Sequence, residues 1–390
     1  MPVAAATETA GILVDLFVVL LAAKLGDELF KRLGQPAIVG EILAGVLIGP
    51  SVLGVVEPGE SLEVFAELGV VFLLFWVGLE TRLSDLREVG ADALKVGALG
   101  VVVPFAGGLA LGVALGEPTA TTVFLGVALV ATSVGITSAV LLELGVLDSR
   151  AARTILGAAI IDDILALTLL AVATGLADSG ELDPVALLTV LGLALAFVAF
   201  VGLGGVRLLA ARPRLLEAPR FSESPLLPAV IICLGLAAFA AQIGLAAIIG
   251  AFLAGMVIAE TKEHHPIEDE VAPLYAFFPP FFFAFIGTQI DLDALADAGA
   301  LALLAGVTLL AFATKYAGAR FGARGMPAAD ARIVGLGMVP RGEVGIIVAG
   351  IGATAGVVED ELFAVIVGMS VLTTVMVPPL LRRIVSVRSV

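Results

Sequence analysis

Two adjacent carboxylates, Asp162 and Asp163, lie inside the apolar stretch Ala-Ala-Ile-Ile-Asp-Asp-Ile-Leu-Ala-Leu. An ionised side chain at the centre of a bilayer costs at least about 2.5–3.5 kcal/mol, so such a residue indicates a function and needs a partner. A carboxylate in a narrow, partly dehydrated cavity can be neutralised by a proton or by a bound cation, and a low dielectric disfavours holding both. The pair therefore predicts exchange of a cation for a proton.

Other polar residues fall at a similar depth in two further apolar stretches. Thr132 and Ser133 lie in one of them, and Arg341 and Glu343 lie in the other. The aspartates lie about 10 residues, or about 15 Å of helix, from the charged residue at the inner end of their stretch. The pair Thr132/Ser133 and the pair Arg341/Glu343 lie about as far from the charged residue at the inner end of theirs. Hydroxyls and freed backbone carbonyls can replace part of the hydration shell of sodium, so we expect these groups to form a cation site near the midplane.

The two aspartates are expected to have different partners. Neighbouring residues on a helix point about 100° apart and do not face each other. We assign Asp163 to the ion and Asp162 to a basic residue, although spacing alone does not orient the pair. Arg341 has Glu343 close by, and each could neutralise the other. Lys315 is only five residues from Arg320, and its spacing leaves open whether it pairs with Asp162 or extends to the interface.

The composition indicates an integral membrane protein. Of 390 residues, 60% are hydrophobic and 15% are charged, against about 45–50% and 25% in soluble domains. The first apolar stretch lacks a positive n-region and a cleavage site, so we interpret it as a first helix and not as a signal peptide. The single cysteine, Cys233, excludes a disulfide framework and a cysteine-based metal site.

Polar clusters, Gly/Pro signals and charges divide the chain into thirteen candidate spans of near-membrane length. They are 11–32, 36–54, 62–80, 88–115, 119–143, 150–175, 184–210, 225–242, 245–260, 269–289, 295–321, 329–355 and 361–381. Lys and Arg occupy every second connection, and the connections between them are acidic. The positive-inside rule then places the N-terminus outside and the C-terminus in the cytoplasm of a multi-pass plasma-membrane protein. The acidic outer face and the net charge of −15 suggest a halophile.

Thirteen spans can be divided into two six-helix halves of opposite topology joined by a linker helix. The fifth span contains Val-Ala-Thr-Ser-Val-Gly-Ile-Thr-Ser (130–138), and the twelfth contains Met-Val-Pro-Arg-Gly-Glu-Val-Gly (338–345). Both stretches contain polar residues and glycine in mid-membrane. Pro340 lacks the backbone N–H that would donate a hydrogen bond in an unbroken helix. The predicted fold class is thus an all-α polytopic membrane protein with inverted repeats and two broken helices, as in secondary transporters.

Several motifs of this chain resemble one family. Ala-Thr-Ser-Val-Gly-Ile-Thr (131–137) followed by Gly-Ala-Ala-Ile-Ile-Asp-Asp-Ile-Leu (157–165) closely resembles the NapA-type sodium/proton antiporters of the monovalent cation:proton antiporter-2 family. Gly40 to Gly45, Val77 to Glu80 and Pro340 to Gly345 are similar to the same family, and the likeness covers nearly the whole chain.

The resemblance implies roles for the candidate residues. Asp163 is expected to carry sodium or protons, Asp162 to assist it, and Lys315 to pair with Asp162. By the same resemblance Thr132 and Ser133 match the first crossing segment, and Arg341 and Glu343 the second. The Asp-Asp form of the motif resembles the electrogenic members, which exchange two protons for one sodium.

The resemblance also implies an architecture and partners. It predicts a dimerisation domain (1–87 and 214–292), a linker helix (179–213) and a mobile core domain (88–178 and 293–390) that moves like an elevator. The expected partners are the lipid bilayer, a second copy of the chain, the monovalent cation and the proton. No cofactor, no nucleic acid and no enzymatic activity are expected.

Two other functions fit the sequence less well than sodium/proton exchange does. A potassium/proton antiporter or potassium efflux system of the same broad family is the alternative. Ligand-gated potassium efflux systems usually carry a cytosolic nucleotide-binding domain, and the chain shows no Gly-x-Gly-x-x-Gly strand-helix unit. An intramembrane aspartyl protease needs its two carboxylates on separate helices, whereas Asp162 and Asp163 are adjacent. We therefore expect a secondary active transporter that exports sodium, or lithium, in exchange for external protons.

Overall fold

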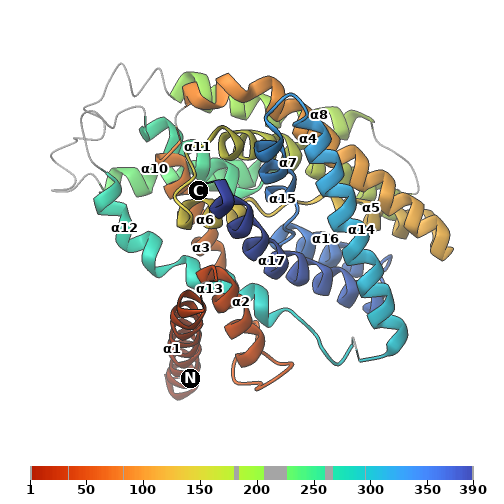
Figure 1. Ribbon diagram of the computed structural model, residues 1–390. Helices are drawn as coiled ribbons and strands as arrows, with labels where there is room; N and C mark the ends of the chain where they lie inside the picture. Colours follow the sequence, from red (N-terminus) through yellow and green to blue (C-terminus); the bar gives the residue numbers. More distant parts are fainter. Residues whose placement is uncertain are drawn as a thin grey trace.

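The computed structural model describes residues 2–33, 35–81, 83–179, 184–205, 226–259, 267–294 and 296–388, which form helices and no strands (Figure 1). In chain order the elements are α1 (Pro2–Arg32), α2 (Ala37–Ile48), α3 (Glu60–Leu79), α4 (Leu83–Leu115), α5 (Thr119–Val130), α6 (Val134–Glu143), α7 (Arg150–Ser179), α8 (Pro184–Ala199), η1 (Phe200–Gly205), α10 (Leu226–Gln242), α11 (Ala247–Ala259), α12 (Glu268–Phe277), α13 (Pro279–Thr288), α14 (Ala298–Gly322), α15 (Ala328–Gly337), α16 (Glu343–Thr354) and α17 (Asp360–Arg388).

Membrane-length apolar helices make up much of the described chain. By length and composition seven qualify: Glu60–Leu79, Glu88–Leu115, Thr119–Glu143, Arg150–Ala177, Glu268–Thr288, Ala298–Gly322 and Asp360–Val385. About 20 apolar residues are needed to cross a bilayer, so the chain is a polytopic membrane protein. The count of thirteen spans stays a prediction.

Three of the expected spans are divided into two helices. The span expected at 119–143 stops at Val130 and restarts at Val134, and the span expected at 329–355 stops at Gly337 and restarts at Glu343. The span expected at 269–289 bends between α12 and α13, where Pro279 begins the second helix. Proline is accepted at the first position of a helix because its missing N–H has no partner there.

The helices pack into two groups that Figure 1 shows side by side. One group contains α1, α2, α3, α10, α11, α12 and α13, and the other contains α4, α5, α6, α7, α14, α15, α16 and α17. Contacts between the groups include those of α6 with α2 and α3 and of α17 with α2. The assignment of these groups to dimerisation and core domains stays a prediction, and 206–225, in the expected linker and the start of the next segment, lies outside the described residues.

Small residues bring helices of the first group into close contact. A Cβ atom on Gly45 of α2 would lie 1.9 Å from the carbonyl oxygen of Ala284 in α13, and one on Gly287 would lie 2.1 Å from that of Ile42. Without a hydrophobic drive between helices in lipid, such close backbone contact is a main source of packing energy. The glycines of α2 therefore pack within the subunit.

Candidate functional site

The two broken helices cross at their breaks. The backbone N–H of Ser133 donates to the carbonyl oxygen of Pro340 at 2.8 Å, and Thr132 Oγ1 donates to the carbonyl oxygen of Met338 at 3.3 Å. Thr132 and Ser133 are buried, with 1% and 0% of their surface exposed. Irregular backbone at membrane depth needs such partners because lipid supplies none.

Lys315 joins the aspartate pair to the first break. Its Nζ donates to Asp162 Oδ1 at 2.5 Å and to the carbonyl oxygen of Val130, the last residue of α5, at 2.6 Å. Both charged side chains are fully buried. The spacing of Lys315 was compatible with an ammonium group that extends to the membrane interface, but the structure places this group inside the helix bundle. The long helix α14 positions it. Asp297 caps the N-terminus of this helix, and its Oδ2 accepts from Gly299 N at 2.7 Å.

Arg341 lies in the second break and reaches across to the first. Its Nη2 donates to the carbonyl oxygen of Leu129 at 2.5 Å and to that of Ala311 at 3.4 Å, and Nη1 is 3.5 Å from the carbonyl oxygen of Met338. The last carbonyls of a helix carry partial negative charge. The end of α5 is thus bound by two cations, Lys315 and Arg341.

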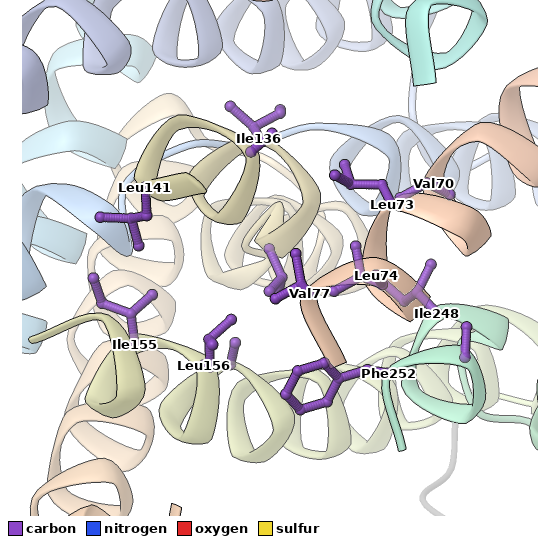
Figure 2. Packing of buried hydrophobic residues seen from close by; sticks show 14 of the residues in the cluster. Val70, Leu73, Leu74, Val77, Ile136, Leu141, Ile155, Leu156, Ile248 and Phe252 are labelled. Atoms are coloured by element: carbon purple, nitrogen blue, oxygen red, sulfur yellow. The ribbon is translucent and has the colours of Figure 1, made fainter. Parts of the chain in front are cut away.

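Asp163 lies at the boundary between the two groups of helices. It is 5% exposed and lines a small cleft of about 20 Å³ with Val134, at the start of α6, and with residues of α3 and α11. Figure 2 shows the packing of the neighbouring hydrophobic cluster, to which Leu74, Leu156 and Phe252, three residues that line the cleft, belong from α3, α7 and α11. Asp163 is the only charged residue among those described around this cleft.

The two aspartates therefore have different surroundings. Asp162 faces Lys315 inside the second group, and Asp163 faces the cleft between the groups. Their successive positions on α7 produce this difference, because neighbouring residues on a helix point in different directions. Glu343 begins α16, but its side chain lies outside the described part of the structure.

Sequence reasoning missed three hydroxyl residues that hold the breaks. Thr137 Oγ1 donates to the carbonyl oxygen of Gly337 at 2.6 Å, at the end of α15. From α17, Thr373 Oγ1 accepts the backbone N–H of Arg341 at 3.2 Å, and Thr374 Oγ1 donates to the carbonyl oxygen of Arg341. Hydroxyls are common in membrane helices, so the only sequence signal was the cluster of Ser370, Thr373 and Thr374 on one helix.

A carboxylate pair beside two crossed, broken helices in a bundle of apolar helices defines a membrane transporter of the ion-exchanging class. Over 96% of each chain, the fold resembles that of the solved sodium proton antiporter MjNhaP1 from Methanocaldococcus jannaschii at pH 8, with a TM-score of 0.71 and 18% identity. The chain belongs to the family described as "Sodium/hydrogen exchanger, transmembrane", whose model matches residues 16–385.

Two relatives match over nearly their whole length. The Na(+)/H(+)-K(+) antiporter GerN of Bacillus cereus is 40% identical over 93% of this chain and 94% of its own length. The high-affinity Na(+)/H(+) antiporter NhaS3 of Synechocystis sp. is 34% identical over 96% and 90%. The expected all-α polytopic antiporter fold and the transporter family are confirmed, and the chain is a transporter, not an enzyme. The inverted repeats stay a prediction. The narrower NapA-type assignment stays a prediction.

Proposed function

We propose that this protein exchanges sodium for protons across the membrane and that Asp163 holds either ion in turn. The observation that carries this proposal is the position of Asp163 as the charged residue in the apolar cleft between the two groups of helices. A carboxylate there is reachable by an ion yet poorly hydrated, so a proton and a sodium ion compete for it. The names of the antiporter relatives support the choice of ions.

Asp162 and Lys315 form the second part of the proposed mechanism. The ammonium of Lys315 neutralises Asp162 and also binds the end of α5, beside Thr132 and Ser133. Sodium at Asp163 brings a second positive charge close to Lys315, which favours loss of a proton from the ammonium. Exchange of two protons for one sodium follows, and it is electrogenic.

Potassium is a second candidate substrate. One relative, 40% identical, is named a Na(+)/H(+)-K(+) antiporter. Carboxylate, hydroxyl and carbonyl oxygens can bind either alkali cation, because both take oxygen ligands. Comparing the two ions on this protein is therefore part of the functional test.

The proposed movement follows from the packing of the two groups. The group that carries Asp162, Asp163 and Lys315 shifts against the other and exposes the Asp163 cleft to each side in turn. We propose that the group without these residues forms a homodimer in the plasma membrane, with the N-terminus outside and the C-terminus in the cytoplasm. No bound cofactor is needed, since the transported ions supply the driving force.

The test uses purified protein in liposomes that carry a fluorescent pH indicator. An outward sodium gradient is expected to acidify the lumen, and a potassium gradient of equal size tests the second candidate. A change in rate with imposed membrane potential reports charge movement. Sodium gradients that move no protons would contradict the proposed function.

A further inference from the structure

A groove lies at the end of α14, away from the aspartate pair. Its volume is about 480 Å³, and it is lined by Tyr316, Arg320, Phe321 and Arg324 together with residues at the start of α15. α15 packs tightly against one side of it, since a Cβ atom on Gly335 would lie 2.9 Å from the ring of Tyr316. The groove is therefore formed by two packed helices.

The groove lies where a membrane helix leaves the bilayer. The apolar helix α14 ends at Gly322, between Arg320 and Arg324. Phe321 is 57% exposed there. Aromatic and basic side chains in such positions lie at the level of the lipid head groups.

Arg320 and Arg324 have no carboxylate partner within the described residues. The nearby Asp92 already pairs with Lys95 at 3.6 Å and with Arg150 at 2.9 Å. In a chain with 36 acidic and 21 basic residues, two adjacent unpaired guanidinium groups indicate an anion from outside the chain.

Aromatic rings hold both guanidinium groups. Arg320 lies 5.9 Å from the ring centre of Tyr316, and Arg324 lies 4.8 Å from that of Phe321. Stacking on a ring leaves the N–H edge of a guanidinium group available for phosphate oxygens. Each guanidinium group therefore has N–H donors that a phosphate in the groove can accept from.

We propose that this groove binds the phosphate of an anionic phospholipid head group. Arg320 and Arg324 would contact the phosphate, and the exposed ring of Phe321 and the apolar surface of α14 would contact the glycerol and acyl chains. A lipid fits better than a soluble anion because the groove adjoins the membrane surface and has apolar walls. Basic pockets between membrane helices bind such head groups in other proteins.

The test measures the melting temperature of the purified, delipidated full chain in detergent. Phosphatidylglycerol is expected to raise it by at least about 2 °C over an equal amount of phosphatidylcholine, because a ligand of the folded state stabilises it. The double substitution R320Q/R324Q is expected to abolish this shift. The control R32Q removes an exposed arginine that pairs with Glu28 on α1, and it is expected to keep the shift.

Three results would overturn the proposal. They are equal shifts with both lipids, an unchanged shift in R320Q/R324Q, and the same shift with inorganic phosphate alone, which would indicate a soluble anion.

If R320Q/R324Q does not fold, native mass spectrometry of R320K/R324K serves instead. Lysine keeps the charge but loses bidentate geometry, so bound phosphatidylglycerol is expected to fall about tenfold relative to the wild-type protein. An unchanged occupancy would contradict the proposal.

Discussion

At the scale of single residues, the adjacent aspartates perform two tasks because one helix turns them in different directions. Asp162 is fully buried against Lys315, whereas Asp163 borders the cleft between the helix groups. Removing one partner of a buried ion pair leaves a charge without compensation, which costs about 3–5 kcal/mol. Asp162 and Lys315 should therefore depend on each other for stability.

The substitution D162N is expected to lower thermal stability because it strands the ammonium of Lys315 in the bundle. K315M should do the same by stranding Asp162. The double variant D162N/K315M removes both charges, so it should be more stable than the sum of the two single losses predicts. Melting temperatures of the four proteins in detergent give the coupling, and additive losses would show that the pair contributes no interaction.

Asp162 and Lys315 also determine the proposed stoichiometry. D162N/K315M keeps Asp163, so sodium should still drive proton movement, but one proton should move for each sodium. Exchange should then lose its dependence on membrane potential, because the net charge moved is zero. Fluorescence assays on liposomes with a potassium-valinomycin potential measure this. Unchanged voltage dependence would exclude the pair from charge coupling.

At the scale of elements, the site depends on two helices that stop in mid-membrane. The end of α5 presents the carbonyls of Leu129 and Val130, which Arg341 and Lys315 bind. The end of α15 presents the carbonyl of Gly337, which Thr137 binds. The helix ends that a break exposes are thus bound by charges and hydroxyls from other helices.

The substitution G342A tests the crossing of the two breaks. A Cβ atom at Gly342 would lie 2.7 Å from Ser133 Oγ and 2.8 Å from Ser133 Cβ, so the segments would have to separate. Overpacking of this kind costs about 1–3 kcal/mol, and sodium-driven proton flux is expected to fall with it. The matched control is G350A on α16, where an added Cβ meets nothing within 4 Å. Equal flux in both variants would contradict a close crossing.

The positions of the breaks were predictable from sequence, but their partners were not. Pro340, the glycines and the polar residues in apolar spans indicated where the helices stop. Which carbonyls Arg341 and Lys315 bind depends on how far α14 and α15 are rotated and shifted against α5, and helical spacing carries no such information. For the same reason the depth of Lys315 was compatible with either pairing or extension to the interface.

At the scale of the whole molecule, contacts between the two groups of helices include those of α6 with α2 and α3 and of α17 with α2. One such contact joins α6 to α2, where the carboxylate of Glu143 accepts the backbone N–H of Ala37 at 3.1 Å. That bond binds the N-terminus of a helix, where a negative charge is favourable. If the groups shift against each other during exchange, this contact has to open.

Cross-linking α2 to α6 tests that movement. Cysteines at positions 37 and 143, introduced with C233S, can be joined by a short bifunctional maleimide. Joined protein is expected to lose nearly all sodium-driven proton flux, because the two groups can no longer shift. Each single-cysteine variant treated in the same way is the control. Full flux in the joined protein would exclude relative movement at this boundary.

The central claim is that sodium and protons compete for Asp163, and sodium binding at varied pH tests it most directly. Radioactive sodium binding to the purified protein is expected to weaken by at least about tenfold for each unit of pH decrease once protons occupy the site. D163N is expected to abolish sodium binding at every pH. Sodium affinity that is independent of pH, or that persists in D163N, would contradict the account.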